Sequence, residues 1–196
     1  MKIFQCDGGH IVLPKPSLVL MSREDGGNLL VNPPREVWER SELNPDELTK
    51  WSFLVSATGR AMLDVLPQLT DGCINYWEAG NWALNEQAEP VGPKTPRLHR
   101  KMHLHLLGRG RSAPRWGDAP RFPDFTDRFS WSSAFERLSP EECRAIVIAT
   151  ETALRSKYGL PNRSIAPWST CAGCGYPTCT DSVKSHILCE ECTNKL

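Results

Sequence analysis

Two Cys-x-x-Cys pairs near the C-terminus constrain most strongly what this chain can fold into. They are Cys171 with Cys174 and Cys189 with Cys192, and 14 residues separate them. Four thiolates at this spacing can close a tetrahedral shell around zinc, and a segment too short to bury its own core gains folding free energy from the metal. A redox Cys-x-x-Cys needs only one pair and a thioredoxin-like context, which the sequence lacks. We therefore predict a zinc site in a small zinc-ribbon or knuckle-like module over residues 161–196.

The segment between the two pairs offers two further donors, Cys179 and His186, either of which can replace one predicted ligand. Four thiolates leave no open position for water, so the expected role of the zinc is structural. Residues 164–196 contain two Lys and no Arg against three acidic residues. Because nucleic-acid backbones require a basic patch, nucleic acid is not an expected partner of this tail.

Length and cysteine usage bound the class of protein. The chain has 196 residues, 40% of them hydrophobic, which suffices for one packed domain, expected over residues 1–160, and a small appendage. Five of the eight cysteines fall within the last 26 residues, which favours metal binding over disulfides. The N-terminus lacks the apolar core of a signal peptide, and no stretch reaches the roughly 18 apolar residues that span a bilayer. These features predict a cytoplasmic protein with no membrane contact.

Capping signals mark two long helices. In each, an N-cap residue is followed by proline at the first helical position and glutamate at the capping-box position: Asn44, Pro45 and Glu47 in the first helix, and Ser139, Pro140 and Glu142 in the second. The apolar runs "HIVLP", "SLVLM" and "NLLVNP", and later "GCINYWE", predict strands. Because these strands do not alternate with helices, the pattern indicates an α+β fold rather than a doubly wound sheet.

The segment "KMHLHLLGRGR", residues 101–111, predicts a strand with two histidines on one face. Successive side chains of a strand alternate, so His103 and His105 face one way and the neighbouring apolar residues the other. From Lys94 to Arg128 there are nine Lys or Arg against three Asp, which favours an anionic ligand such as a phosphate ester.

Three interpretations of the histidine pair remain open at this stage. The two imidazoles can ligate one metal with a third ligand from His99, Glu36 or His10. One imidazole can instead attack a phosphorus while the other hydrogen-bonds the phosphate or the leaving group. They can also be satisfied polar residues on a sheet face.

Three segments together resemble the histidine-triad (HIT) superfamily. "KMHLHLLGR" looks like its signature strand, "NLLVNPPREVWERSELNPDELTKW" like its strand, proline-basic turn and first helix, and "INYWEAGNWALN" like its asparagine-bearing strand and glycine turn. The match covers roughly residues 10–110. The resemblance implies an antiparallel sheet of about five strands with two main helices, and a homodimer.

The resemblance also implies roles for individual residues. His103 falls on the histidine that attacks the α-phosphorus of a nucleotide, and His105 on the one that contacts the phosphate and leaving group. Asn75 and the turn at Gly80 and Asn81 fall on positions that line the nucleotide side of the site. Arg109 and Arg111, from the basic run after the strand, are expected to hold phosphate oxygens bidentately.

Two positions depart from the resembled pattern. Lys101 stands where the superfamily has its first histidine, and Glu36 where it has a further histidine after the proline-basic turn. Lys101 can pair with phosphate oxygens but cannot accept a proton as imidazole does. We therefore predict a nucleotide hydrolase or nucleotidyl transferase acting on a nucleoside phosphate, a phosphoramidate or a dinucleoside polyphosphate through nucleotidyl-His103. The alternatives are a non-catalytic nucleotide-binding or interaction protein, and a metal-dependent hydrolase with His103 and His105 as ligands.

Overall fold

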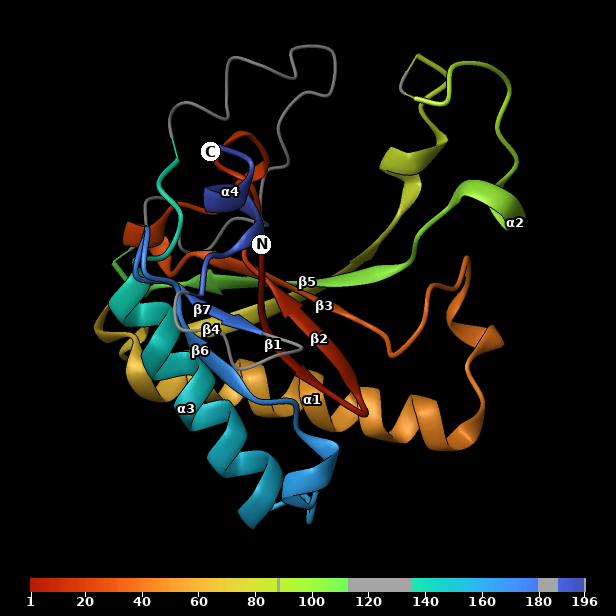
Figure 1. Cartoon of the computed structure of the whole chain (residues 1–196). Helices are drawn as coiled ribbons and strands as arrows, with labels where there is room; N and C mark the ends of the chain where they lie inside the picture. The colour runs from red at the N-terminus through yellow and green to blue at the C-terminus, as the bar shows by residue number, and fades with distance from the viewer. Residues whose placement is uncertain (88, 113–134, 180–186, 196) are drawn as a thin grey trace.

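A five-stranded antiparallel sheet forms the centre of the molecule, and the strand order is β1-β2-β3-β5-β4 (Figure 1). The computed structural model describes residues 1–87, 89–112, 135–179 and 187–195. Within them the strands are β1 Lys2–Cys6, β2 Gly9–Val12, β3 Asn28–Asn32, β4 Cys73–Ala79, β5 His103–Arg109, β6 Trp168–Thr170 and β7 Pro177–Cys179. The helices are α1 Pro45–Val65, α2 Pro96–His99, α3 Pro140–Ser156 and α4 Glu190–Thr193. The predicted α+β class and five-stranded antiparallel sheet are confirmed.

The two long helices begin where their capping signals predict. Asn44 accepts from the Glu47 N–H at 2.9 Å, and the Glu47 carboxylate accepts from the Asn44 N–H, which completes a capping box at α1. Ser139 and Glu142 make the same reciprocal pair at α3. Each box satisfies backbone N–H groups that have no partner within the helix, so these local sequences fix both start points.

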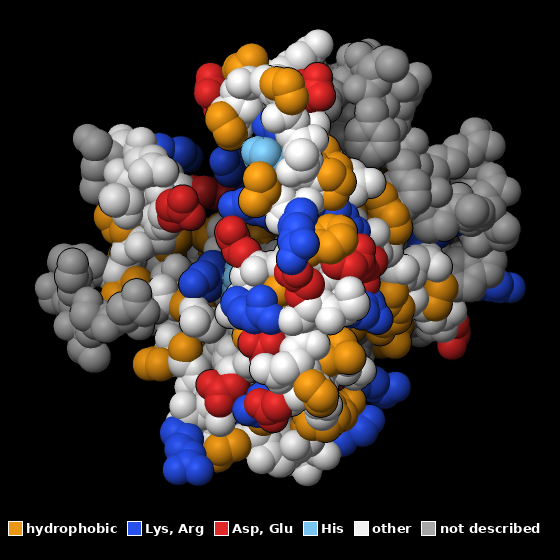
Figure 2. Space-filling model, turned by 90° about the vertical axis from the view of Figure 1, so that its right-hand side faces the viewer, with side chains coloured by type: hydrophobic (Ala, Val, Ile, Leu, Met, Phe, Trp, Pro, Cys, Tyr) orange, Lys and Arg blue, Asp and Glu red, His pale blue; other side chains and the backbone are white. Residues whose placement is uncertain are grey.

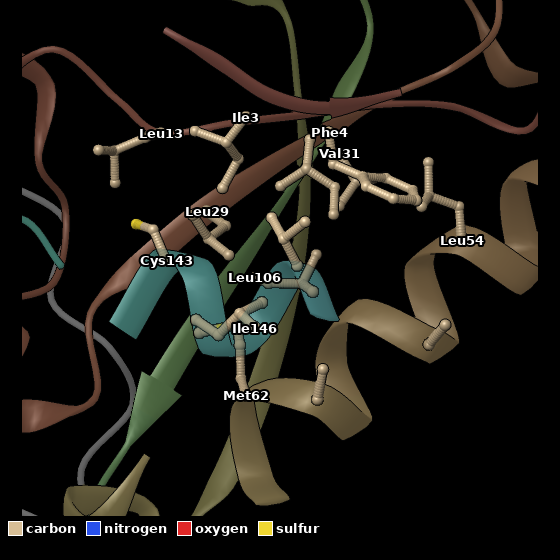
Figure 3. Packing of buried hydrophobic residues seen from close by; sticks show 14 of the residues in the cluster. Ile3, Phe4, Leu13, Leu29, Val31, Leu54, Met62, Leu106, Cys143 and Ile146 are labelled. Carbon is tan, nitrogen blue, oxygen red and sulfur yellow. The ribbon is translucent and has the colours of Figure 1, made fainter. Parts of the chain in front are cut away.

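Helices α1 and α3 pack on one face of the sheet and enclose the core (Figures 1 and 3). Side chains of β5 alternate, and Leu104 and Leu106 point into this core. They meet Leu54 from α1 and Ile146 from α3, and Leu54, Leu106 and Ile146 are fully buried. Because even-numbered residues of β5 serve the core, its odd-numbered residues, including both histidines, lie on the opposite face of the sheet.

One predicted strand is wrong and one strand was missed. "SLVLM" does not pair with the sheet: Pro16 opens a 3-10 turn, Pro16–Leu18, and the N–H of Leu20 donates to the Asn28 side chain instead of to a strand. The missed strand is β1, which pairs with β2 through the Asp7–Gly8 turn. An irregularity in register between Lys2 and Phe4 buries two consecutive residues, so the sequence of β1 shows no period-two pattern.

The C-terminal tail packs against the free edge of β1. Strands β6 and β7 form a separate two-stranded sheet, and β7 lies beside β1 (Figure 1). Cys171, Tyr176 and Cys189 of the tail belong to the same buried cluster as the sheet residues. The division at residue 160 stays a prediction, but packing joins the tail to the main core. Within the described ranges, every helix is too short or too polar to cross a membrane.

Candidate functional site

Strand β5 carries the two histidines, flanked by β3 and β4. Leu30 of β3 and Trp77 of β4 lie opposite His105, and Ala79 of β4 lies opposite His103. The Trp77 ring stacks on the His105 ring with centroids 5.0 Å apart and planes inclined by 24°. Both histidines are buried, with exposed fractions of 5% for His103 and 8% for His105. The sequence predicted the shared face correctly, but both rings are buried rather than lining an open cleft.

The two imidazoles are hydrogen-bonded to each other and anchored to the backbone. His103 Nδ1 lies 2.9 Å from the Lys101 carbonyl oxygen, and His103 Nε2 lies 3.0 Å from His105 Nε2. A carbonyl oxygen only accepts, so Nδ1 of His103 carries the proton and its Nε2 carries a lone pair when the ring is neutral. The proton between the two rings then belongs to His105 Nε2. This inferred tautomer gives His103 a nucleophilic nitrogen and His105 a donor aimed at it.

Burial keeps both rings neutral at ordinary pH. It lowers the pKa of His103, although donation to the Lys101 carbonyl acts in the opposite direction. It lowers the pKa of His105 to about 3, and the neighbouring His103 adds to the effect. A third histidine, His10 on β2, pairs with Asn32 and has its pKa lowered to about 4, chiefly by burial.

Gly80 sits against the carbonyl that anchors His103. A Cβ at Gly80 would come within 2.6 Å of the Lys101 oxygen, and its φ is 152°, which side chains rarely adopt. The glycine turn after β4 thus lies close to the backbone just before the start of β5. Asn81, next to it, is exposed and accepts from Arg100 Nε at 2.9 Å.

The two residues that replace expected histidines form an ion pair with each other. Lys101 Nζ lies 3.0 Å from Glu36 Oε1, and their side chains are 52% and 77% exposed. A pair as exposed as this contributes at most about 1 kcal/mol to stability. Lys101 and Glu36, the two residues that differ from the histidine-triad pattern, therefore lie together beside the start of β5. They form a charged pair in place of two imidazoles.

The remaining predicted residues are spread along the same face. Asn75 lies opposite Leu107, one row beyond the histidines, and is partly buried. Arg109 lies at the far end of β5, opposite Cys73, and is 7% exposed. Arg111 is exposed beyond the end of the strand.

One alternative ligand is displaced by the local fold. His99, one of the possible third ligands, ends the short helix α2, and its Nδ1 accepts from the Thr95 N–H at 3.1 Å. Pro96 at the first position of α2 favours that turn over a strand. Residues 113–134, which include part of the basic run from Lys94 to Arg128, lie outside the described residues.

The cysteine cluster is a candidate metal centre. One ligand atom from each of Cys171, Cys174, Cys189 and Cys192 lies within 4.8 Å of the others, and Cys174 Sγ is 3.5 Å from Cys189 Sγ. Zn–S bonds of about 2.3 Å in a tetrahedron would hold the sulfurs about 3.8 Å apart, so the four thiols fit such an ion. All four are free thiols rather than disulfides. The predicted group of four is confirmed as able to hold a metal.

Backbone N–H donors lower the pKa of Cys171 and so favour the thiolate form that binds a metal. Burial by itself raises the pKa of the Cys171 thiol, but N–H groups of Cys189, Cys174 and Gly173 favour the thiolate and lower that pKa to about 6. Cys179 lies in β7, opposite Trp168, and does not belong to the group of four. His186, the other alternative ligand, lies outside the described residues.

Polar contacts tie the metal centre to the segment before α3. Arg137 binds both carboxylate oxygens of Glu191, within the second Cys-x-x-Cys, at 3.0 and 3.1 Å. The Arg137 guanidinium also lies over the Tyr176 ring, 4.8 Å from its centroid, and the Tyr176 hydroxyl donates to the Leu138 carbonyl. Cations and anions alternate on the face shown in Figure 2, so that face carries no continuous basic patch.

Across the described residues, the cysteine cluster is the one group of three or more His, Cys, Asp or Glu able to hold a metal. Among them, neither His10, Glu36 nor His99 joins His103 and His105 as a third ligand. Comparison with known protein families, with curated proteins and with solved structures yields no match. The site must therefore be interpreted from its own geometry.

Proposed function

We propose that this protein is a nucleotide hydrolase or nucleotidyl transferase of the histidine-triad type, in which His103 attacks the α-phosphorus. The observation that carries the proposal is the hydrogen-bonded pair: His103 Nδ1 donates to the Lys101 carbonyl and His103 Nε2 faces His105 Nε2 at 3.0 Å. A neutral imidazole anchored through one nitrogen presents the other nitrogen as a nucleophile. The lowered pKa of His103 supports this, because the ring is unprotonated at neutral pH.

The reaction has two steps. In the first, the lone pair of His103 Nε2 forms a bond to phosphorus, the bond from phosphorus to the leaving group breaks, and the leaving group takes that electron pair. His105 Nε2–H hydrogen-bonds the departing atom and keeps its own proton, because the neutral ring would otherwise become an imidazolate, and a leaving group that needs a proton takes it from water. In the second step, water attacks phosphorus and releases its proton to solvent, and the P–N bond breaks, which returns the electron pair to His103 Nε2. An acceptor hydroxyl in place of water gives transfer instead of hydrolysis.

Other residues of the same face are assigned to substrate binding. The carbonyl of Lys101 anchors His103. A phosphate can replace Glu36 as the ion-pair partner of the Lys101 side chain. Asn75 faces the same side of the sheet one row further on, and Arg109 supplies buried positive charge at the end of β5. Arg111 and Asn81 stay predicted substrate contacts at the exposed margins of the site. The substrate must displace the contact between the two imidazoles, which are otherwise buried.

The decisive experiment detects the covalent intermediate. The protein is mixed with adenosine phosphoramidate or a dinucleoside polyphosphate, quenched in base to preserve the P–N bond, and examined by intact mass. We expect an adenylyl adduct that is lost in His103→Ala. His99→Ala is the matched control and should keep the adduct, because His99 lies on α2 outside the pair. Absence of both adduct and turnover with every nucleotide tested would remove the enzymatic proposal.

A second candidate, a non-catalytic nucleotide-binding protein, is favoured by one observation. The Lys101–Glu36 ion pair occupies the two positions where the resembled superfamily has supporting histidines. In this candidate, nucleotide binding measured by calorimetry survives His103→Ala and no product forms. His103→Ala and its control His99→Ala therefore distinguish the nucleotide hydrolase or transferase from the non-catalytic nucleotide-binding protein.

We also propose that the metal of the cysteine cluster is structural zinc. The support is the set of four thiols with tetrahedral spacing and the absence of a position for water in a four-thiolate shell. Metal analysis should find one zinc per chain that is lost in Cys174→Ser. Cys73→Ser is the matched control, because Cys73 is an exposed free thiol outside the cluster. Iron in place of zinc, or an unchanged metal content in Cys174→Ser, would contradict this assignment. The homodimer and the cytoplasmic location stay predictions.

A further inference from the structure

Asn28 of β3 is a buried residue that the sequence did not single out, and it lies beside the histidine pair. It pairs with Leu107, and its neighbour Leu30 pairs with His105. Asn28 and His105 are therefore diagonal neighbours on the same face of adjacent strands. Such neighbours have Cα atoms about 7–8 Å apart, within reach of side chains of this length.

Asn28 and His105 each have one buried polar atom without a hydrogen-bond partner among the described residues. These atoms are Asn28 Nδ2 and His105 Nδ1, and the two residues are 1% and 8% exposed. The Asn28 carboxamide is oriented by its other end, because Oδ1 accepts from the Leu20 N–H at 3.0 Å. Its unpartnered end is therefore a donor.

The unpartnered nitrogen of His105 is an acceptor. The bond between the two imidazoles assigns the His105 proton to Nε2, which leaves a lone pair on Nδ1. A buried donor and a buried acceptor thus lie on adjacent strands, and neither has another hydrogen-bond partner within the part of the chain that the structure describes. Leaving such groups unpaired costs about 1–3 kcal/mol each, which favours any motion that joins them.

We propose that Asn28 is a positioning residue that donates from Nδ2 to His105 Nδ1 when phosphate occupies the position facing His103 Nε2. This inference rests on the proposed function, because it assigns the step in which His105 acts. Once a phosphate oxygen accepts the hydrogen bond from His105 Nε2–H, the His105 ring is released from His103 and turns its Nδ1 toward Asn28. The amide then holds the His105 proton on Nε2, from which it can hydrogen-bond the leaving group.

The first test is made with adenosine monophosphate bound, because the proposal places the Asn28 contact in the occupied site. Asn28→Asp keeps an oxygen for the Leu20 N–H but replaces the donor with a carboxylate that only accepts. In protein with 15N-labelled histidine, long-range proton–nitrogen spectra identify which ring nitrogen is protonated. We expect wild-type His105 to be protonated at Nε2 and the Asn28→Asp variant at Nδ1. His10, which pairs with Asn32 on β2, is the internal control and should not change. An unchanged His105 tautomer in a folded Asn28→Asp protein overturns the inference.

The second test uses the wild type alone, so it does not depend on a variant that folds. Adenosine monophosphate is added to saturation while the side-chain amide of Asn28 is followed. We expect its protons to shift downfield, as they do on gaining an acceptor. If the nucleotide shifts the two histidines and leaves this amide unchanged, the positioning role is wrong. If it shifts no resonance of the site, nucleotide binding itself fails, and the positioning role of Asn28 fails together with the proposed function.

A kinetic measurement separates positioning from binding. With adenosine phosphoramidate as substrate, Asn28→Asp should lower kcat by about tenfold or more and change KM little, because loss of one hydrogen-bond donor to the charge that develops on the leaving group costs at least this much. A change confined to KM would place Asn28 in substrate binding instead and would contradict the positioning role.

Discussion

The stability of this protein should depend on pH through its buried histidines, and His105 allows the size of the effect to be worked out. Its pKa is lowered from 6.5 to about 3 in the folded protein because burial disfavours the charged ring. In the unfolded chain the ring titrates normally, so below about pH 6.5 the unfolded state binds a proton that the folded state does not. The contribution is fully present above that pH and is lost as the pH falls toward 3.

The magnitude follows from the gap between the two pKa values. One pKa unit corresponds to about 1.4 kcal/mol, so between about pH 7.5 and about pH 5 the titration of His105 removes about 2 kcal/mol of unfolding free energy. Urea unfolding of the wild type and of His105→Gln at the two pH values measures this loss. We expect the variant to lose about 2 kcal/mol less than the wild type over the same interval.

A control separates titration from general destabilisation. Ile146→Val removes one buried methyl group from α3 and should cost about 0.5–1.5 kcal/mol at both pH values. Its loss between the two pH values should therefore equal that of the wild type. If His105→Gln also loses as much as the wild type, His105 is not held neutral by burial, and the protonation assigned to the imidazole pair is wrong.

Three further predictions follow from other contacts. Removing the metal with a chelator should lower the thermal unfolding midpoint of the whole protein rather than of the tail alone, because Cys171 and Cys189 pack within the common core; a separate transition of the tail would contradict this. Ser139→Ala should cost about 1 kcal/mol in urea unfolding through loss of the α3 capping box, and an unchanged midpoint would count against it. Lys101→Gln should weaken binding of adenosine monophosphate several-fold in calorimetry while changing stability by less than about 1 kcal/mol, because its ion pair with Glu36 is exposed; unaltered affinity would exclude Lys101 as a phosphate contact.

Local signals in the sequence were sufficient to predict where the two long helices begin, that the two histidines share a face of the sheet, and which four cysteines can hold a metal. The capping residues Asn44 and Ser139 determine where α1 and α3 begin, because the hydrogen bonds involved span only three residues. The alternation around His103 and His105 determines that both share a face of β5, since pleating is a property of the strand itself. The spacing of the four cysteines indicates a metal cluster for a similar reason, because each Cys-x-x-Cys closes locally.

Tertiary structure alone decided which partners these residues meet. Lys101 and Glu36 are 65 positions apart, and their pairing exists only because β5 passes beside the segment that follows β3. The 3.0 Å contact between the two imidazoles depends on ring orientation, which burial and the stacked Trp77 fix. The position of Asn28 beside His105 depends on the register of β3 against β5, and no short-range pattern encodes that register. The sequence by itself thus determined the chemical groups and their local geometry, whereas their pairing and the burial that keeps His105 neutral arose only from packing of distant segments.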